Sequence, residues 1–265
     1  MKNEETNLAW EKVKLARMPS RPTALEYIDN IFDEFVEFSG DRSFKDDKSI
    51  VGGIGLIGKQ AFTIIAEQKG RNTKENLERN FGMPNPEAYR KSLRLMKQAE
   101  KFNRPIITFI DTKGAYPGIG AEERGQGEAI ARNIMEMSAL KVPILVFVIG
   151  EGSSGGALAI GVGDRIIMLE NSIYSILSPE GYASILWKDG SKSKEAAEIM
   201  KLTSQDLYEL GVIDKILKEP KGGASENMHL VSQKIKEEIQ KFVNDYKDVS
   251  KEELIDARYS KFRNM

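Results

Sequence analysis

The stretch that most constrains the fold of this chain is Val142–Gly161, with the sequence VPILVFVIGEGSSGGALAIG. Its first half is apolar and rich in β-branched residues, which is typical of a buried strand. A turn rich in glycine and serine follows, and the small residues after the turn favour a helix that packs closely on a sheet. The segment therefore predicts a strand, a turn with bare backbone N–H groups, and a helix.

A second segment of the same kind lies upstream. The apolar run Pro105–Ile110 leads into Asp111–Gly120, with the sequence DTKGAYPGIG, and then into a segment with helical composition. Two strand–loop–helix units predict an α/β fold with both loops at neighbouring strand ends. Open α/β sheets bind their ligands at such ends.

Composition excludes several classes of function. The chain has 39 basic and 40 acidic side chains, and this balance gives no argument for nucleic acid or an anionic membrane as partner. It has no cysteine and a single histidine, His229, so we expect no disulfide, no cysteine nucleophile and no metal site in this chain. The N-terminus lacks the apolar core of a signal peptide, and no apolar run approaches the length of a membrane span, so a cytoplasmic protein is expected.

Residues 1–22 are predicted to form a helical arm, with a helix over 7–17, and residues 23–265 a single domain with a C-terminal helical extension. Thr23 is expected to cap a helix that runs to Phe38. Ile50–Ile57 and Gln60–Glu67 read as a hairpin. The hairpin contains a G-x-G-x-x-G pattern, but no helix follows it, so it does not predict a nucleotide site.

The polar stretch 69–86 is predicted to be a long loop with one helical turn, and Pro86 starts the next helix. Basic side chains of both segments, among them Lys69, Arg71 and Arg90, either bind a phosphate-bearing ligand or form an ordinary solvated surface. For the remainder the patterns predict strands at 165–169, 172–177 and 212–217, helical segments at 182–187, 193–200, 203–211 and 227–247, and a charged tail.

The turn before Gly155 has a chemical use. The first N–H groups of a helix lack intrahelical partners and carry partial positive charge, and Gly155, Gly156 and Ala157 offer no bulk that blocks an approaching oxygen. This arrangement suits an oxyanion or enolate. The alternative is that small residues are needed only for close packing of the helix on the sheet. In the upstream loop, Tyr116 either lines a flat ligand or caps the core.

Residues 152–156 also match G-x-S-x-G, with Ser154 at the nucleophile position. A serine hydrolase would need His229 as the base, and the order Ser154, then Asp164 or Asp214, then His229 matches that of α/β-hydrolases. The competing interpretation is an ordinary exposed histidine at the start of a surface helix.

The chain contains a series of distinctive blocks in a fixed order. They are 51–54 (VGGI), 68–71 (QKGR), 73–76 (TKEN), 79–84 (RNFGMP), 89–91 (YRK), 95–102 (LMKQAEKF), 114–126 (GAYPGIGAEERGQ), 155–164 (GGALAIGVGD), 178–181 (SPEG) and 185–189 (ILWKD). Together, from about residue 9 to residue 223, the chain resembles the carboxyltransferase alpha subunit of bacterial acetyl-CoA carboxylase.

This resemblance implies a crotonase-like fold, a ββα spiral within the α/β class, and transfer of a carboxyl group from carboxybiotin to acetyl-CoA, which gives malonyl-CoA for fatty-acid synthesis. It implies a biotin carboxyl carrier protein that presents the carboxybiotin, a biotin carboxylase in the full complex, and a carboxyltransferase beta subunit in an α2β2 assembly. The active site would be shared between alpha and beta subunits. A noncatalytic scaffold is the further alternative.

For the site, the resemblance implies backbone oxyanion donors at Gly155, Gly156 and Ala157. It implies a biotin pocket walled by Gly114, Ala115 and Tyr116, and candidate contacts of Lys69, Arg71 and Arg90 to CoA phosphates. Four positions depart from the family pattern: Lys113 replaces a proline, Ser153 a glycine, and Glu67 and Ser39 histidines.

Overall fold

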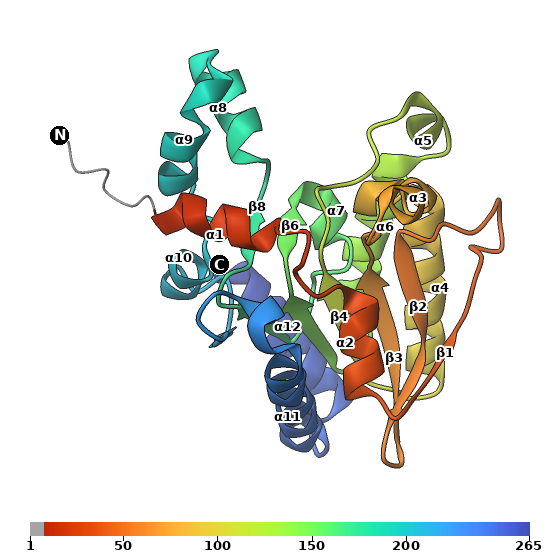
Figure 1. The fold of residues 1–265 in the computed structure, drawn as a ribbon. Helices are drawn as coiled ribbons and strands as arrows, with labels where there is room; N and C mark the ends of the chain where they lie inside the picture. The colour runs from red at the N-terminus through yellow and green to blue at the C-terminus, as the bar shows by residue number, and fades with distance from the viewer. Residues whose placement is uncertain (1–7) are drawn as a thin grey trace.

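The computed structural model describes residues 8–265, so that residues 1–7 of the predicted arm lie outside the described residues. At its centre is a seven-stranded sheet in the order β1–β2–β3–β4–β5–β7–β9 (Figure 1). The strands are β1 (Glu34–Glu37), β2 (Ile50–Ile57), β3 (Gln60–Glu67), β4 (Ile106–Ile110), β5 (Ile144–Val148), β6 (Glu151–Ser153), β7 (Arg165–Leu169), β8 (Ile173–Ser175) and β9 (Lys215–Leu217).

Helices fill most of the connections between the strands. They are α1 (Leu8–Ala16), α2 (Ala24–Ile31), α3 (Thr73–Glu78), α4 (Pro86–Lys101), α5 (Ile119–Glu123), α6 (Gln126–Ala139), α7 (Ser154–Leu158), α8 (Pro179–Trp187), α9 (Ser193–Ile199), α10 (Ser204–Glu209), α11 (Met228–Tyr246) and α12 (Lys251–Arg263). None of the helices within residues 8–265 has the length and apolar character that a membrane crossing requires.

The sheet changes from antiparallel to parallel at β3. The hairpin of β2 and β3 is confirmed, with Gly58 at φ +59° in its turn, and from β3 to β9 all neighbours are parallel. A separate pair of short parallel strands, β6 and β8, continues beyond the ends of the main sheet. The sequence did not reveal β6, which lies inside the glycine- and serine-rich turn.

The prediction of a helix from Thr23 to Phe38 is wrong in its second half. The helix ends at Ile31, Phe32 is extended (φ −97°, ψ 139°), and the next residues form β1, which is antiparallel to β2. Pairing with the open edge of β2 outweighs the helical periodicity of the segment, because an uncovered edge leaves a row of N–H and C=O groups unpaired.

The glycines of the G-x-G-x-x-G pattern serve this packing. A Cβ on Gly53 would lie 2.2 Å from the carbonyl oxygen of Val36, and a Cβ on Gly55 would lie 2.8 Å from the Phe32 ring. The glycines therefore allow β1 and the end of α2 to approach β2, and no helix follows them.

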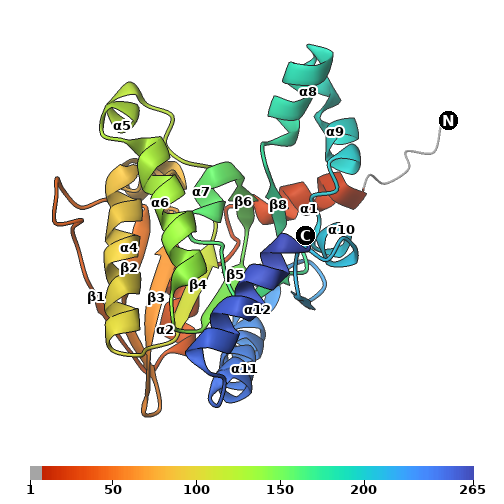
Figure 2. The ribbon, with the colours of Figure 1, turned by 180° about the vertical axis from the view of Figure 1, so that it is seen from behind.

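Helices cover both faces of the sheet. Helices α4 and α6 lie on one face (Figure 2), where Leu95, Met96 and Met137 join the buried cluster. Helices α2 and α11 lie on the other face, with Ile28, Ile235 and Phe242 buried against it. Full burial of a side chain of this size contributes about 1.5–3 kcal/mol, and side chains on both faces hold the parallel strands in place.

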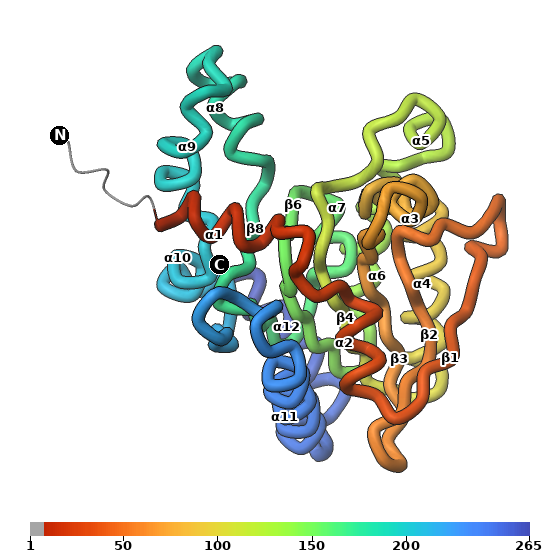
Figure 3. Tube along the Cα trace, in the orientation of Figure 1, coloured from red at the N-terminus to blue at the C-terminus, as the bar shows by residue number. Residues whose placement is uncertain are grey.

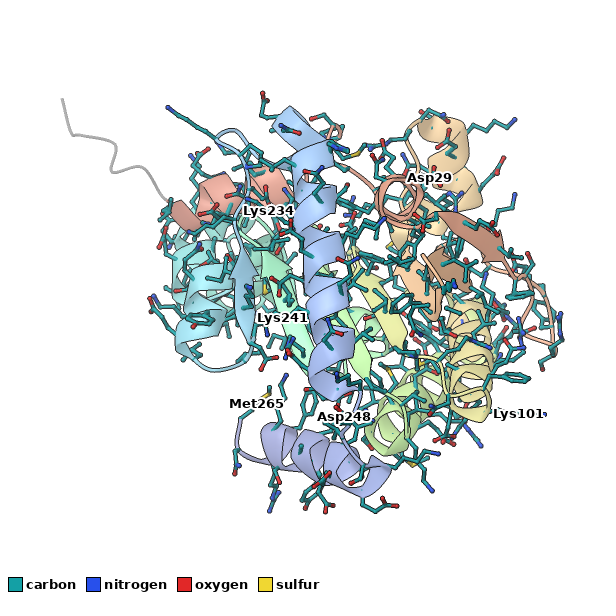
Figure 4. The ribbon with its side chains drawn as sticks, turned by 90° about the horizontal axis from the view of Figure 1, so that it is seen from below. Asp29, Lys101, Lys234, Lys241, Asp248 and Met265 are labelled. Carbon is teal, nitrogen blue, oxygen red and sulfur yellow. The ribbon has the colours of Figure 1, made fainter. Side chains whose placement is uncertain are left out.

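The predicted charged tail is instead a helix, α12, which lies crosswise to α11 beyond the turn at Asp248 (Figure 4). Arg258 of α12 is 1% exposed. Its guanidinium donates to both carboxylate oxygens of Asp164, at 2.8 and 2.7 Å, and to the carbonyl oxygens of Met137, Leu140 and Val142. Arg258 thus anchors the C-terminal helix, and the count of charges along the tail could not reveal it.

The N-terminal arm lies across the short strands β6 and β8 (Figure 3). In α1, Val13 is buried, and Lys12 donates to the carbonyl oxygen of Glu170 at 2.7 Å. Arg17, just after α1, forms ion pairs with Glu151 of β6 (2.7 Å) and Glu180 of α8 (2.8 Å). The arm therefore connects the glycine-rich turn to the projecting pair of helices α8 and α9.

Candidate functional site

The two glycine loops leave neighbouring parallel strands, β4 and β5, at the same edge of the sheet. Beyond the strand ends, Thr112 N–H donates to the carbonyl oxygen of Glu151 at 2.6 Å, and Ile149 N–H donates to that of Ile110 at 3.0 Å. The loops thus stay hydrogen-bonded after the strands have ended.

The backbones of the loops touch at Gly156. A Cβ on this residue would lie 2.5 Å from the amide nitrogen of Ala115 and 2.7 Å from the carbonyl carbon of Gly114. No side chain fits in that space, since real Cβ atoms are essentially never found so close to backbone atoms. The predicted juxtaposition of the two loops is confirmed, and the glycine at 156 is explained by it.

Helix α7 begins at Ser154, one residue before the predicted start. By the helical pattern, the N–H groups of Gly155 and Gly156 lack intrahelical partners, whereas the N–H of Ala157 is the first that reaches a carbonyl four residues back. Gly155 is half-buried, and Gly156 and Ala157 are buried. Of the three, Gly155 is the donor most open to a ligand.

Hydrogen bonds within the upstream loop define its shape. The hydroxyl of Thr112 accepts from Gly114 N–H at 3.0 Å and donates to the carbonyl oxygen of Gly82 at 2.6 Å. Gly114 has φ +124°, which favours glycine. Lys113 is exposed, and the Tyr116 ring lies over Gly118, where a Cβ would be 2.4 Å from the ring. Tyr116 is 37% exposed and does not cap the core.

An apolar cavity of about 510 Å³ opens beside α7. Ser154 and Gly155 lie at its wall, so the candidate N–H donor and the cavity share one surface. The other lining residues are Leu158, Tyr174, Ser175, Ile176, Tyr182, Met200, Lys201, Leu207, Leu210 and Val212. None of these residues could be identified from the sequence, because they come from α7, β8, α8, α10 and the segments between them, and only folding brings these together.

The three basic residues proposed for phosphate contacts all have partners within the chain. Lys69 forms an ion pair with Asp111, with 2.5 Å between Nζ and Oδ1. Arg71 donates to the carbonyl oxygens of Pro19 and Arg21, both at 2.9 Å, and forms an ion pair with Glu26. Arg90 donates to the carbonyl oxygen of Arg124. A phosphate would have to compete with these partners.

Glu67 is fully buried below the loops. Its Oε2 accepts from the N–H of Asp111 at 3.1 Å, and Oε1 has no hydrogen-bond partner among residues 8–265. Burial raises the pKa of this carboxyl well above its ordinary value, and the nearby Asp111 carboxylate raises it further. The folded protein therefore holds a proton on Glu67 more tightly than the unfolded chain does.

We expect a pH dependence from this residue. The stability associated with protonated Glu67 is present below the unfolded pKa of about 4.3 and falls as the pH rises toward the folded pKa. Glutamine does not titrate, so Glu67→Gln should stabilise the protein more at pH 8 than at pH 5. Urea unfolding at four pH values between these limits measures the difference in the free energy of unfolding between the variant and the parent. Glu237→Gln on the exposed face of α11 is the control. A gain that stays constant or shrinks with rising pH contradicts the assignment.

The components of a serine hydrolase are not brought together. Ser154 is exposed and has φ +58°, but the His229 ring, within residues 8–265, is hydrogen-bonded to the Gln233 side chain, 3.0 Å away on the exposed face of α11. Asp164 is bound by Arg258, and Asp214 by Lys261 and the N–H of Ile166. Neither aspartate orients the histidine.

Solved structures share this fold. Over 89% of this chain and 44% of the other, the structure superimposes on transcarboxylase 12S, which was solved with methylmalonyl-coenzyme A and methylmalonic acid bound, with a TM-score of 0.69 at 16% sequence identity. This likeness confirms the predicted crotonase-like α/β fold.

Relatives in sequence cover the whole fold. The acetyl-coenzyme A carboxylase carboxyl transferase subunit alpha of Clostridium perfringens is 60% identical over 257 residues, which are 97% of this chain and 95% of the relative. A Clostridium tetani protein named as subunits beta/alpha is 61% identical over 255 residues, 96% of this chain and 44% of the longer relative. A family model described as acetyl co-enzyme A carboxylase carboxyltransferase-like matches residues 3–265. The chain therefore belongs to the family of acetyl-coenzyme A carboxylase carboxyltransferase alpha subunits.

Proposed function

We propose that this chain is the alpha half of an enzyme that moves a carboxyl group from carboxybiotin to acetyl-CoA, with malonyl-CoA as product. The observation that carries the proposal is the contact of the two loops at Gly156, next to Gly155, whose free N–H lies at the wall of an apolar cavity. The assignment of the reaction as carboxyl transfer to acetyl-CoA follows from membership of the family. We also propose that the reaction takes place in the cytoplasm.

The donors act where charge develops. Carboxybiotin, when bound here, would supply the carboxyl group, and negative charge would build on its ureido oxygen as that group leaves. We assign Gly155 and Gly156 as the N–H donors to that oxygen, with Ala157 the least available of the three. A preorganised donor of this kind lowers the barrier by about 3 kcal/mol.

Gly114, Ala115 and Tyr116 are proposed as the biotin wall. The backbone of the first two lies against Gly156, next to the donors, which supports this role. Contacts of Lys69, Arg71 and Arg90 to CoA phosphates remain a prediction. To make such a contact, each side chain would have to give up the partner within the chain that is described above.

The chain is proposed to work with other proteins. A beta subunit would complete the site in an α2β2 assembly, as the joined beta and alpha subunits of the Clostridium tetani relative suggest. A biotin carboxyl carrier protein would present the carboxybiotin, and a biotin carboxylase would recharge it.

The test is the reverse half-reaction, in which malonyl-CoA and biocytin give acetyl-CoA and carboxybiocytin. The chain is assayed alone and after assembly with a beta subunit from the same source. Activity in the mixture alone supports the shared site. No activity in a correctly assembled complex contradicts the proposal and favours a noncatalytic scaffold.

Ser154→Ala and His229→Gln separate this function from hydrolysis. Both variants are expected to keep carboxyl transfer within about threefold of the parent, because only backbone groups of the turn take part, whereas loss of a triad residue costs several powers of ten. Thioester hydrolysis that disappears with either substitution would favour the hydrolase instead.

A further inference from the structure

A buried ion pair lies beneath the two loops. Lys69 follows β3 and Asp111 follows β4, and their charged groups are 2.5 Å apart. The side chains are 19% and 8% exposed, so the pair is largely shielded from water. Burial of two charges is costly unless each is well partnered, and removal of one leaves the other buried without compensation.

The Asp111 carboxylate also holds the turn that precedes α7. Its Oδ1 accepts from the N–H of Glu151 at 2.9 Å. A Cβ on Gly150 would lie 2.3 Å from the same oxygen, so the carboxylate rests directly on the backbone of the turn. Thr112 N–H donates to the carbonyl oxygen of Glu151, so residues 111 and 112 together bind both the backbone N–H and the backbone carbonyl group of Glu151.

Lys69 also supports the loop that follows β4, which contains Thr112 and Gly114. A Cβ on Gly82 would lie 2.7 Å from Cγ of Lys69, so the lysine stem packs against that glycine. The carbonyl oxygen of Gly82 accepts from Thr112, whose hydroxyl also accepts from Gly114 N–H. Displacement of Lys69 would therefore disturb both loops that meet at Gly156.

We propose that Lys69 and Asp111 are positioning residues for carboxyl transfer: their ion pair fixes the Gly150–Glu151 turn and, through it, the N–H donors at the start of α7. This rests on the proposed function of those donors. It assigns Lys69 a role inside the protein, in contrast to the predicted contact with a CoA phosphate, and the two roles give different kinetics.

The first experiment uses the assembled complex with the beta subunit and compares Lys69→Met, Asp111→Asn, the double variant and Lys69→Arg in the reverse half-reaction. A misplaced donor costs about 100-fold in rate, so each neutral single variant should lose about that much in kcat, with the KM for malonyl-CoA within about twofold of the parent. The double variant leaves no unpaired charge and should recover at least about tenfold over either single variant. Lys69→Arg keeps the ion pair and should lose less than Lys69→Met.

Two kinetic results would overturn the proposal. If Lys69→Met raises the KM for malonyl-CoA and leaves kcat unchanged, Lys69 contacts the substrate. If the losses of the single variants multiply in the double variant, the residues act independently. Lys241→Met, which breaks the exposed pair with Asp245 on α11, is the matched control and should leave both constants unchanged.

The second experiment does not depend on activity. Amide hydrogen exchange is measured for peptides that cover residues 149–154, in the parent, Lys69→Met and the double variant. Faster exchange of the Glu151 amide in Lys69→Met, partly reversed in the double variant, is expected, with peptides of α11 unchanged. Unchanged exchange at Glu151 overturns the proposal. An inactive parent complex would instead count against the proposed function, and the exchange measurement would still decide this inference.

Discussion

Replacement of Gly156 by valine is expected to abolish carboxyl transfer in the assembled complex, with a fall in kcat of at least about 1,000-fold. The branched side chain would have to occupy space only 2.5 Å from the nitrogen of Ala115, so the two loops must separate. That movement displaces the N–H donors of Gly155 and Gly156, and loss of one such donor already costs about 100- to 1,000-fold. The reverse half-reaction with malonyl-CoA and biocytin measures the effect.

Matched glycine substitutions calibrate this result. Gly155→Ala places a methyl group 3.3 Å from Cγ2 of Ile130, which is a close side-chain contact but no backbone clash, and should lose about tenfold or less. Gly127→Ala in α6 meets no atom of residues 8–265 within 4 Å and should leave activity unchanged while it stabilises the helix by about 0.5–1 kcal/mol. A Gly156→Val variant that assembles with the beta subunit and keeps a tenth of the activity would show that the donors do not depend on this contact.

Replacement of Arg258 by methionine is expected to lower the free energy of unfolding by about 3–5 kcal/mol, which is the usual cost of breaking a buried ion pair. The variant would leave Asp164 charged and buried, and it would remove the donor to the carbonyl oxygens of Met137, Leu140 and Val142. Urea unfolding at pH 7 with linear extrapolation gives the difference.

The double variant Arg258→Met, Asp164→Asn should be more stable than Arg258→Met alone, because no buried charge then lacks a partner. Arg263→Met at the exposed end of α12 is the control and should change stability by less than about 0.5 kcal/mol. If Arg258→Met unfolds at the same urea concentration as the control, α12 does not stabilise the sheet.

The loops and their contact were predictable because local sequence determines them. An apolar run that ends in glycines marks a strand end, and two such runs predict neighbouring parallel strands. The start of α7 was predicted within one residue. The glycines at 53, 55 and 156 were visible in the sequence, but their reasons were not, since each makes room for a segment from elsewhere in the chain.

Two predictions of local structure were wrong, and both have the same cause. Residues 34–37 have helical periodicity and form a strand because the edge of β2 is available to them. Residues 251–263 have the composition of a solvated tail and form a helix because Arg258 finds Asp164. In both segments a contact distant in sequence outweighs the local pattern, and one sequence without its fold does not show that contact.

In the site, too, the features set by local sequence were predictable and those set by distant contacts were not. Gly155 and Gly156 could be identified because backbone donors need small residues at a turn, whereas the cavity wall is assembled from separate helices, strand β8 and the segments between them, and has no motif. Lys69 was predicted as a candidate phosphate contact, but its ion-pair partner Asp111 follows a different strand and could not be identified from the sequence. Only the parallel pairing of β3 and β4 brings the two together.

The contacts of Arg258 have a consequence for how the folded protein opens. The arginine joins α12 both to Asp164, which precedes β7, and to the carbonyl oxygen of Met137 in α6. Detachment of α12 alone would leave the Asp164 carboxylate buried without its cation, which is costly. We therefore expect α12 to open together with the sheet as one cooperative unit, so that its amide hydrogens exchange as slowly as those of the neighbouring strands.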